Sequence, residues 1–152
     1  MPPDTKNERP RFVDIVEDEL GARLGARPAI YSEKLTLFIA HLDRDGSPVA
    51  DVDAWITSAE VVLSKIGGGA TSVAVRGAWL GDATAPIHEP TTLVYTYAAP
   101  EKIEEAVASI RDFALRYGRD TNQGEVAVLL ENTDGDWFFS IPLAREKAPN
   151  DP

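Results

Sequence analysis

The order in which strand-like and helix-like apolar patterns alternate limits most strongly how this chain can fold. The run EKLTLFIAHL, residues 33–42, is almost continuously apolar, which is typical of a central strand buried on both faces. Apolar residues then recur at spacings of three and four over 52–66, which predicts an amphipathic helix ended by the glycines at 67–69. Two strand patterns follow at 71–80 and 91–98, most simply a hairpin with a long connection.

The second half of the chain repeats this alternation and adds one strand. Pro100 and the acids after it predict another helix, with an apolar stripe from Ile103 to Tyr117 and Gly118 as its C-cap. The runs EVAVLLEN and WFFSIPL flank TDGD, and Asp-Gly between apolar runs indicates a β-hairpin. The order predicts an α+β fold, a ferredoxin-like βαββαβ sandwich with an added N-terminal helix and an extra C-terminal hairpin strand.

The chain is expected to form one domain over residues 12–144. Residues 1–11 and 145–152 are polar and contain prolines, so disordered tails are predicted at both ends. Apolar residues from Phe12 to Leu24 recur at helical spacing before Gly25, which predicts an N-terminal helix that packs on the body. The N-terminus lacks the apolar core of a signal peptide, and no apolar run approaches the roughly 20 residues that span a bilayer. A cytoplasmic protein without membrane contact is therefore expected.

The charge of the chain is strongly acidic and unevenly distributed. There are 25 acidic against 15 basic residues, for a net charge of −10, and no Lys or Arg lies between Arg119 and Arg145. Such a field repels nucleic acids and favours a basic protein partner. A solubilising surface is the alternative explanation of the same charges. The acids of this base-free stretch that are candidate binding residues are Glu125, Glu131, Asp134 and Asp136.

The middle of the sequence resembles small bacterial proteins in a family of unknown function. Members show a Gly-x-Trp strand, a Glu before the next strand, and a Gln before a final apolar strand. The matching residues here are Gly77, Trp79, Glu89 and Gln123, and the resemblance covers roughly residues 34–131. It implies the fold and carries no activity.

The segment from Trp79 to Glu89 poses the sharpest question about a site. His88 could act as a general base, Glu89 could orient it, and Trp79 could offer a stacking surface. Adjacent residues on an extended segment point to opposite faces, however, so His88 and Glu89 cannot easily act on one atom. The structural interpretation is favoured: Trp79 packs over the hairpin, and Glu89 binds a backbone N–H or a base such as Arg76.

No motif for a nucleophile, a bound phosphate or a dinucleotide occurs in the sequence, and no cofactor is expected. The only histidines are His41 and His88, too few for a histidine-rich metal centre, and the DRDG segment after His41 departs from the calcium-loop pattern. No metal site is therefore predicted.

The favoured hypothesis is a non-enzymatic, acidic protein-binding module, such as a regulator, an antitoxin-like neutraliser or an inhibitor of a basic or nucleic-acid-binding partner. Its candidate binding residues are the four acids above together with Trp79, Glu89, Tyr95, Tyr97 and Trp137. The alternative is a small enzyme or ligand-binding domain that uses the open sheet face, with Tyr95, Tyr97, His41, His88 and Glu131 in one pocket. A third hypothesis is a homodimer formed through a sheet edge, because exposed edges and aromatic residues favour pairing.

Overall fold

The computed structural model describes residues 11–12, 19–26, 31–80 and 84–144, in two units that divide after Ile30. In the first unit, helix α2 (Gly21–Leu24) ends at Gly25, whose φ of 63° is left-handed, as expected of a glycine that closes a helix. Apart from Phe12 and the residues from Glu19 onward, the predicted N-terminal helix lies outside the described residues. The predicted tails, apart from Arg11, lie outside them as well.

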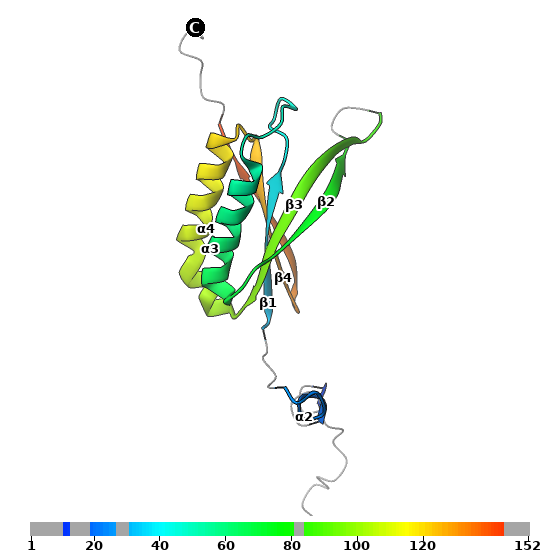
Figure 1. Ribbon diagram of the computed structural model, residues 1–152, viewed down its shortest axis with the longest axis vertical. Coiled ribbons are helices and arrows are strands. Elements are labelled where there is room, and N and C mark those ends of the chain that lie inside the picture. The colour runs from blue at the N-terminus through cyan, green and yellow to red at the C-terminus, as the bar shows by residue number, and fades with distance from the viewer. Residues whose placement is uncertain (1–10, 13–18, 27–30, 81–83, 145–152) are drawn as a thin grey trace, which may run out of the picture. The chain divides into compact units, whose positions relative to one another are not determined.

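The second unit is a five-stranded antiparallel sheet with two helices on one face (Figure 1). The strand order is β2-β3-β1-β4-β5, so β1 is central and β2 and β5 form the edges. This arrangement confirms the α+β class. The elements are β1 (Glu33–Ala40), α3 (Val52–Gly67), β2 (Thr71–Trp79), β3 (Ile87–Ala98), α4 (Pro100–Asp120), β4 (Glu125–Asn132) and β5 (Gly135–Pro142).

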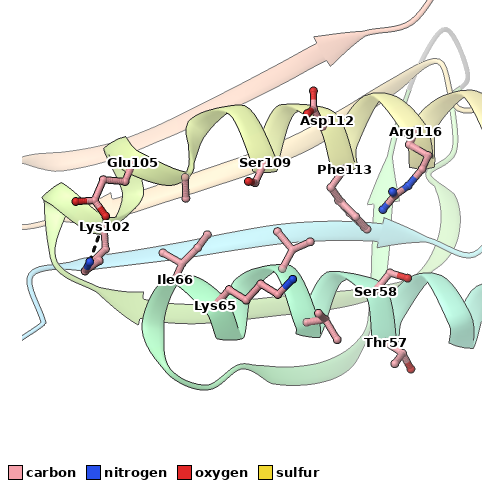
Figure 2. A pocket seen from close by; sticks show the side chains of 13 residues that line it. Thr57, Ser58, Lys65, Ile66, Lys102, Glu105, Ser109, Asp112, Phe113 and Arg116 are labelled. Carbon is pink, nitrogen blue, oxygen red and sulfur yellow. Dashed lines mark hydrogen bonds and ion pairs between the residues drawn. The ribbon is translucent and has the colours of Figure 1, made fainter.

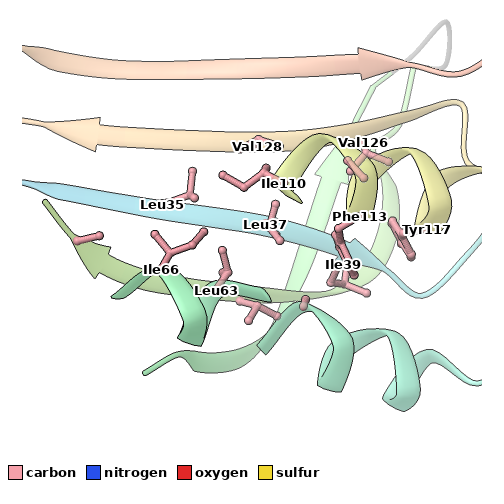
Figure 3. Packing of buried hydrophobic residues seen from close by; sticks show 14 residues of the cluster. Leu35, Leu37, Ile39, Leu63, Ile66, Ile110, Phe113, Tyr117, Val126 and Val128 are labelled. Carbon is pink, nitrogen blue, oxygen red and sulfur yellow. The ribbon is translucent and has the colours of Figure 1, made fainter. Parts of the chain in front are cut away.

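The core lies between the sheet and the two helices. Alternate residues of β1, Leu35, Leu37 and Ile39, point toward the helices and are buried against side chains such as Leu63 and Phe113 (Figure 3). Because side chains alternate along a strand, the other residues of β1 face the side of the sheet opposite these helices. The central position predicted for this strand is confirmed.

Strand β3 begins at Ile87, earlier than the predicted start at 91, and it contains Pro90. A proline inside a sheet normally removes a hydrogen bond. Here the Pro90 carbonyl accepts the N–H of His41, while the His41 carbonyl accepts the N–H of Val49. The strand tolerates Pro90 because the carbonyl that would need its missing N–H is bound elsewhere.

Helix α4 continues past Gly118 to Asp120, so the predicted C-cap at Gly118 is wrong. Gly118 is buried, and a Cβ built on it would clash with Leu143 and lie 3.1 Å from a methyl group of Val126. The glycine lets α4 pack closely against β4 and Leu143 and does not form a left-handed turn. In the described part of the chain, no helix combines the length and the apolar character needed to cross a membrane.

Candidate functional site

The sheet face opposite the helices brings together polar and aromatic side chains from three strands. Lys34 of β1 stands between Tyr97 of β3 and Glu131 of β4 in the strand register. Two residues further along β1, Thr36 stands directly opposite Tyr95. Directly opposed residues of antiparallel strands share a face. These five residues, Lys34, Thr36, Tyr95, Tyr97 and Glu131, are here called the open-face cluster.

The charges and rings of the open-face cluster contact one another. The Lys34 ammonium lies 3.1 Å from a Glu131 carboxylate oxygen and 4.9 Å from the centre of the Tyr95 ring. The rings of Tyr95 and Tyr97 meet edge to face, with centroids 5.8 Å apart. The hydrogen bond to Glu131 raises the pKa of Lys34 above its ordinary value. The cluster therefore presents a cation, an anion and two aromatic rings side by side.

Thr36 lies at the floor of the cluster with its hydroxyl buried. Its residue exposure is 2%, and its Oγ1 has no hydrogen-bond partner among the described residues. An unsatisfied buried hydroxyl costs about 1–3 kcal/mol. Buried polar groups without a hydrogen-bond partner are rare in folded proteins.

A second polar cluster lies where β1 ends. The N–H of Leu42 donates to the Glu89 carboxylate, and the side-chain amide of Gln123 donates to the Leu42 carbonyl at 3.0 Å. The Tyr117 hydroxyl donates to the carbonyl of Ala40 at 3.0 Å. Burial raises the pKa of Glu89 despite the Leu42 N–H, and burial raises the pKa of Tyr117 to about 12. This cluster ties main-chain segments together, as the structural interpretation of Glu89 expected.

The pocket that the enzyme hypothesis required from histidines and Glu131 does not form. His41 Nε2 lies 2.8 Å from the Thr92 hydroxyl, on the helix-covered side of the sheet. His88 stands on β3 opposite Ala78, near the β2–β3 connection. Glu131 pairs with Lys34. Lys34 precedes His41 by seven residues, which corresponds to about 23 Å along an extended strand. No proton or metal can be shared across that distance.

The remaining predicted binding residues are spread over the sheet. Trp79 is half exposed and lies opposite Ile87, far from Tyr95 and Tyr97. Glu125 accepts a hydrogen bond from the hydroxyl of Ser140. Trp137 lies on the helix side of β5, whereas Asp134 and Asp136 are exposed near the turn before it. Sequence reasoning missed Lys34 and Thr36, although two polar residues at alternate positions of an apolar strand could have identified them.

A groove of about 660 Å³ lies between α3 and α4 on the outer face of the helices (Figure 2). Lys65 and Arg116 line it, and Lys102 is paired there with Glu105 at 3.1 Å. Apolar side chains form the floor of the groove, and no described residue that lines it has a buried polar atom without a hydrogen-bond partner. Among the described residues, no three His, Asp or Glu side chains gather as a metal site would require.

Known proteins resemble this chain in fold rather than in sequence. No protein-family model matches the chain, and no curated protein sequence matches it. Two solved structures share its fold: a phage SAM lyase in complex with S-methyl-5'-thioadenosine and a phage SAM lyase in the apo state. Each aligns with a TM-score of 0.57 and covers 80% of this chain and 97% of the other, with identities of 15% and 16% respectively.

This likeness contradicts the prediction of a non-enzymatic, acidic protein-binding module, because both of the matched structures are of an enzyme. The acidic stretch on which that prediction depended is also partly neutralised. Glu131 binds Lys34, a cation supplied by a strand far away in the sequence. The absence of bases between Arg119 and Arg145 in the sequence therefore did not describe the folded surface.

Proposed function

We propose that this protein is a small enzyme or ligand-binding domain whose open-face cluster takes an adenosine-type sulfonium or thioether. S-Adenosylmethionine and S-methyl-5'-thioadenosine are the two probes of this class. The observation that carries the proposal is the juxtaposition of Tyr97 with the Lys34–Glu131 pair above the unsatisfied hydroxyl of Thr36. The shared fold with phage SAM lyase supports this choice of ligand.

The tyrosines suit a purine. Tyr97 is 50% exposed, and its ring is held edge to face by Tyr95, so one surface of the pair is open to a planar base. Stacking of a base on an aromatic side chain contributes about 1–3 kcal/mol. The contact needs no particular hydrogen-bond pattern, because every base has a π-face.

The ion pair suits the other end of such a ligand. S-Adenosylmethionine carries a carboxylate, an ammonium and a sulfonium, so Lys34 would bind the first while Glu131 faces the cations. Both side chains remain about one third exposed, which leaves room for exchange of partners. The Tyr95 face already lies near a cation, and a sulfonium can use the same attraction. The net charge of −10 favours the approach of a cationic ligand.

We also propose that the fold is ferredoxin-like, as the sequence predicted. It is supported by the element order of β1, α3, β2, β3, α4 and β4, with both helices over one face. In that arrangement β5 is an addition, and the face opposite the helices is the natural place for a ligand.

The test is calorimetric titration of the protein with each probe. Tyr97→Ala should weaken the binding of both probes by roughly 5- to 150-fold, the range that corresponds to one stacking contact. Lys34→Met should weaken the binding of S-adenosylmethionine more than that of S-methyl-5'-thioadenosine, because the thioether has no carboxylate. Trp79→Ala removes an equally exposed aromatic side chain about 33 Å from Tyr97 along the strands and should change neither affinity.

Chromatography of S-adenosylmethionine that has been incubated with the protein distinguishes the enzyme hypothesis from the binding-domain hypothesis. Release of S-methyl-5'-thioadenosine that Tyr97→Ala slows would support an enzyme, and binding without release would support a binding domain. Failure of both probes to bind, or equal binding by the Tyr97→Ala variant, would overturn the proposal.

A further inference from the structure

The edge strand β5 carries three consecutive aromatic side chains that are about half exposed. The exposed fractions are 43% for Trp137, 62% for Phe138 and 50% for Phe139. Among the described strands, β5 pairs with β4 alone, so its other edge has no strand beside it. Edge strands with large apolar side chains favour pairing with another chain.

The hydrogen bonds of β5 show which main-chain groups point outward. The N–H of Leu143 donates to the Gly124 carbonyl at 2.9 Å, so the polar groups of Leu143 face β4. In an antiparallel pair this direction alternates from residue to residue. Asp136, Phe138 and Ser140 therefore direct their N–H and carbonyl groups away from β4.

We propose that β5 pairs antiparallel with β5 of a second copy of this chain, about a twofold axis at Phe138. The two Phe138 residues would exchange both of their main-chain hydrogen bonds, and each Asp136 would stand opposite the Ser140 of the second copy. Two five-stranded sheets thereby become one continuous sheet.

In this register, the aromatic side chains of one copy lie opposite aromatic side chains of the second copy. The two Phe138 rings meet on the open face, and Trp137 of each copy stands opposite Phe139 of the second copy on the helix side. Phe139 also lines an apolar groove of about 380 Å³ beside α4, together with Val107 and Ile141. The new aromatic pairs would lie along this groove.

The available area suits a dimer. Half-exposed aromatic side chains offer about 100 Å² each, or about 600 Å² over the six rings of two copies. That is half of the ~1,200 Å² at which specific interfaces begin, before the strands and groove residues are counted. The aromatic side chains alone thus supply about half of that area, and the paired strands and the groove residues add to it.

The charges favour a second copy over a basic partner. Residues 137–144 contain no charged side chain, so a cationic protein would find no complement there. The antiparallel register keeps the two Asp136 carboxylates about 13 Å apart along the strands, beyond the ~8 Å over which salt screens charges at physiological ionic strength. Because each copy carries a net charge of −10, added salt should strengthen the dimer.

Sedimentation velocity of the full chain over a range of concentrations and salt tests this pairing. We expect a dimer that salt tightens, and at least a tenfold larger dissociation constant for Phe138→Lys. Val73→Lys is the matched control, because Val73 is 43% exposed on the opposite edge strand β2. A monomer at every concentration, or a dimer broken by Val73→Lys and unaffected by Phe138→Lys, would overturn the proposal.

A second variant is needed because Phe138 also packs edge to face on Phe38, with centroids 5.7 Å apart, and its loss could disturb folding. The chain has no cysteine, so Phe138→Cys introduces a single thiol. The Cα atoms of a hydrogen-bonded antiparallel pair lie about 5.5 Å apart, within the reach of a disulfide. Mild oxidation should link Phe138→Cys into a covalent dimer and leave Val73→Cys monomeric on denaturing gels. The reverse result contradicts this register, and neither result depends on ligand binding at the open-face cluster.

Discussion

Glu89 and Gln123 bind the two polar main-chain groups of the same residue, Leu42, one accepting its N–H and the other donating to its carbonyl. Leu42 follows β1, Glu89 lies in β3, and Gln123 lies between α4 and β4. These two side chains thus join three segments that are distant in the sequence. The resemblance to the bacterial family had singled out both residues without giving either a role.

Loss of the Gln123 amide should destabilise the fold. Gln123→Met keeps the length of this buried side chain and leaves the Leu42 carbonyl without its donor, at a cost of about 1–3 kcal/mol. Urea unfolding followed by circular dichroism measures the change. Glu104→Met, on the exposed face of α4, should shift stability by less than about 0.5 kcal/mol. Equal shifts for the two variants would contradict a role for the amide.

Glu89 should make stability depend on pH in the acidic range. Burial raises its pKa in the folded protein above the ordinary value of 4.5. The favourable contribution of the protonated form is complete below pH 4.5 and is lost as the pH rises through the folded-state pKa. Glu89→Gln should therefore be at least as stable as the unaltered protein at pH 7, and this relative advantage should shrink toward pH 4. Unfolding curves at both pH values measure it; a variant less stable at pH 7 would show that the Leu42 contact outweighs burial.

Tyr117 should ionise at a higher pH than a free tyrosine does. Its folded-state pKa of about 12 exceeds the ordinary value of 10.0, so its contribution to stability is complete below pH 10 and declines as the pH approaches 12. Tyr117→Phe should lose about 0.5–1.5 kcal/mol at pH 7 through the missing bond to Ala40, and less at pH 11. Absorbance at 295 nm should show an ionisation near pH 12 that disappears in the variant. A titration unchanged by the substitution would assign the late group elsewhere.

Two neighbouring glycines should respond differently to alanine. A Cβ on Gly67 would collide with the Thr96 hydroxyl and the Tyr97 carbonyl, whereas a Cβ on Gly69 meets nothing within 4 Å. Gly67→Ala should therefore cost about 1–3 kcal/mol through overpacking, and Gly69→Ala should be close to neutral. Thermal unfolding of the two variants compares them directly. A neutral Gly67→Ala would mean that α3 can move away from β3 without loss.

The order of the elements could be read from the sequence because periodicity is a local property. The stripe over residues 52–66 and the alternation near Tyr95 and Tyr97 each show in a short window. They predicted both helices, the hairpins and the central strand. The start of β3 and the end of α4 were misjudged because Pro90 and Gly118 act through distant partners, the His41 main chain and Leu143.

The amino-acid sequence by itself determined the elements, the core stripes and the overall excess of acid. Only the tertiary structure decided which side chains meet: Lys34 with Glu131, Thr36 beneath Tyr95, and Glu89 and Gln123 at Leu42. Strand register determines these contacts, and register depends on pairing between segments that are far apart in the chain. A charge that is unpaired along the sequence can therefore be paired in the fold, as Glu131 is.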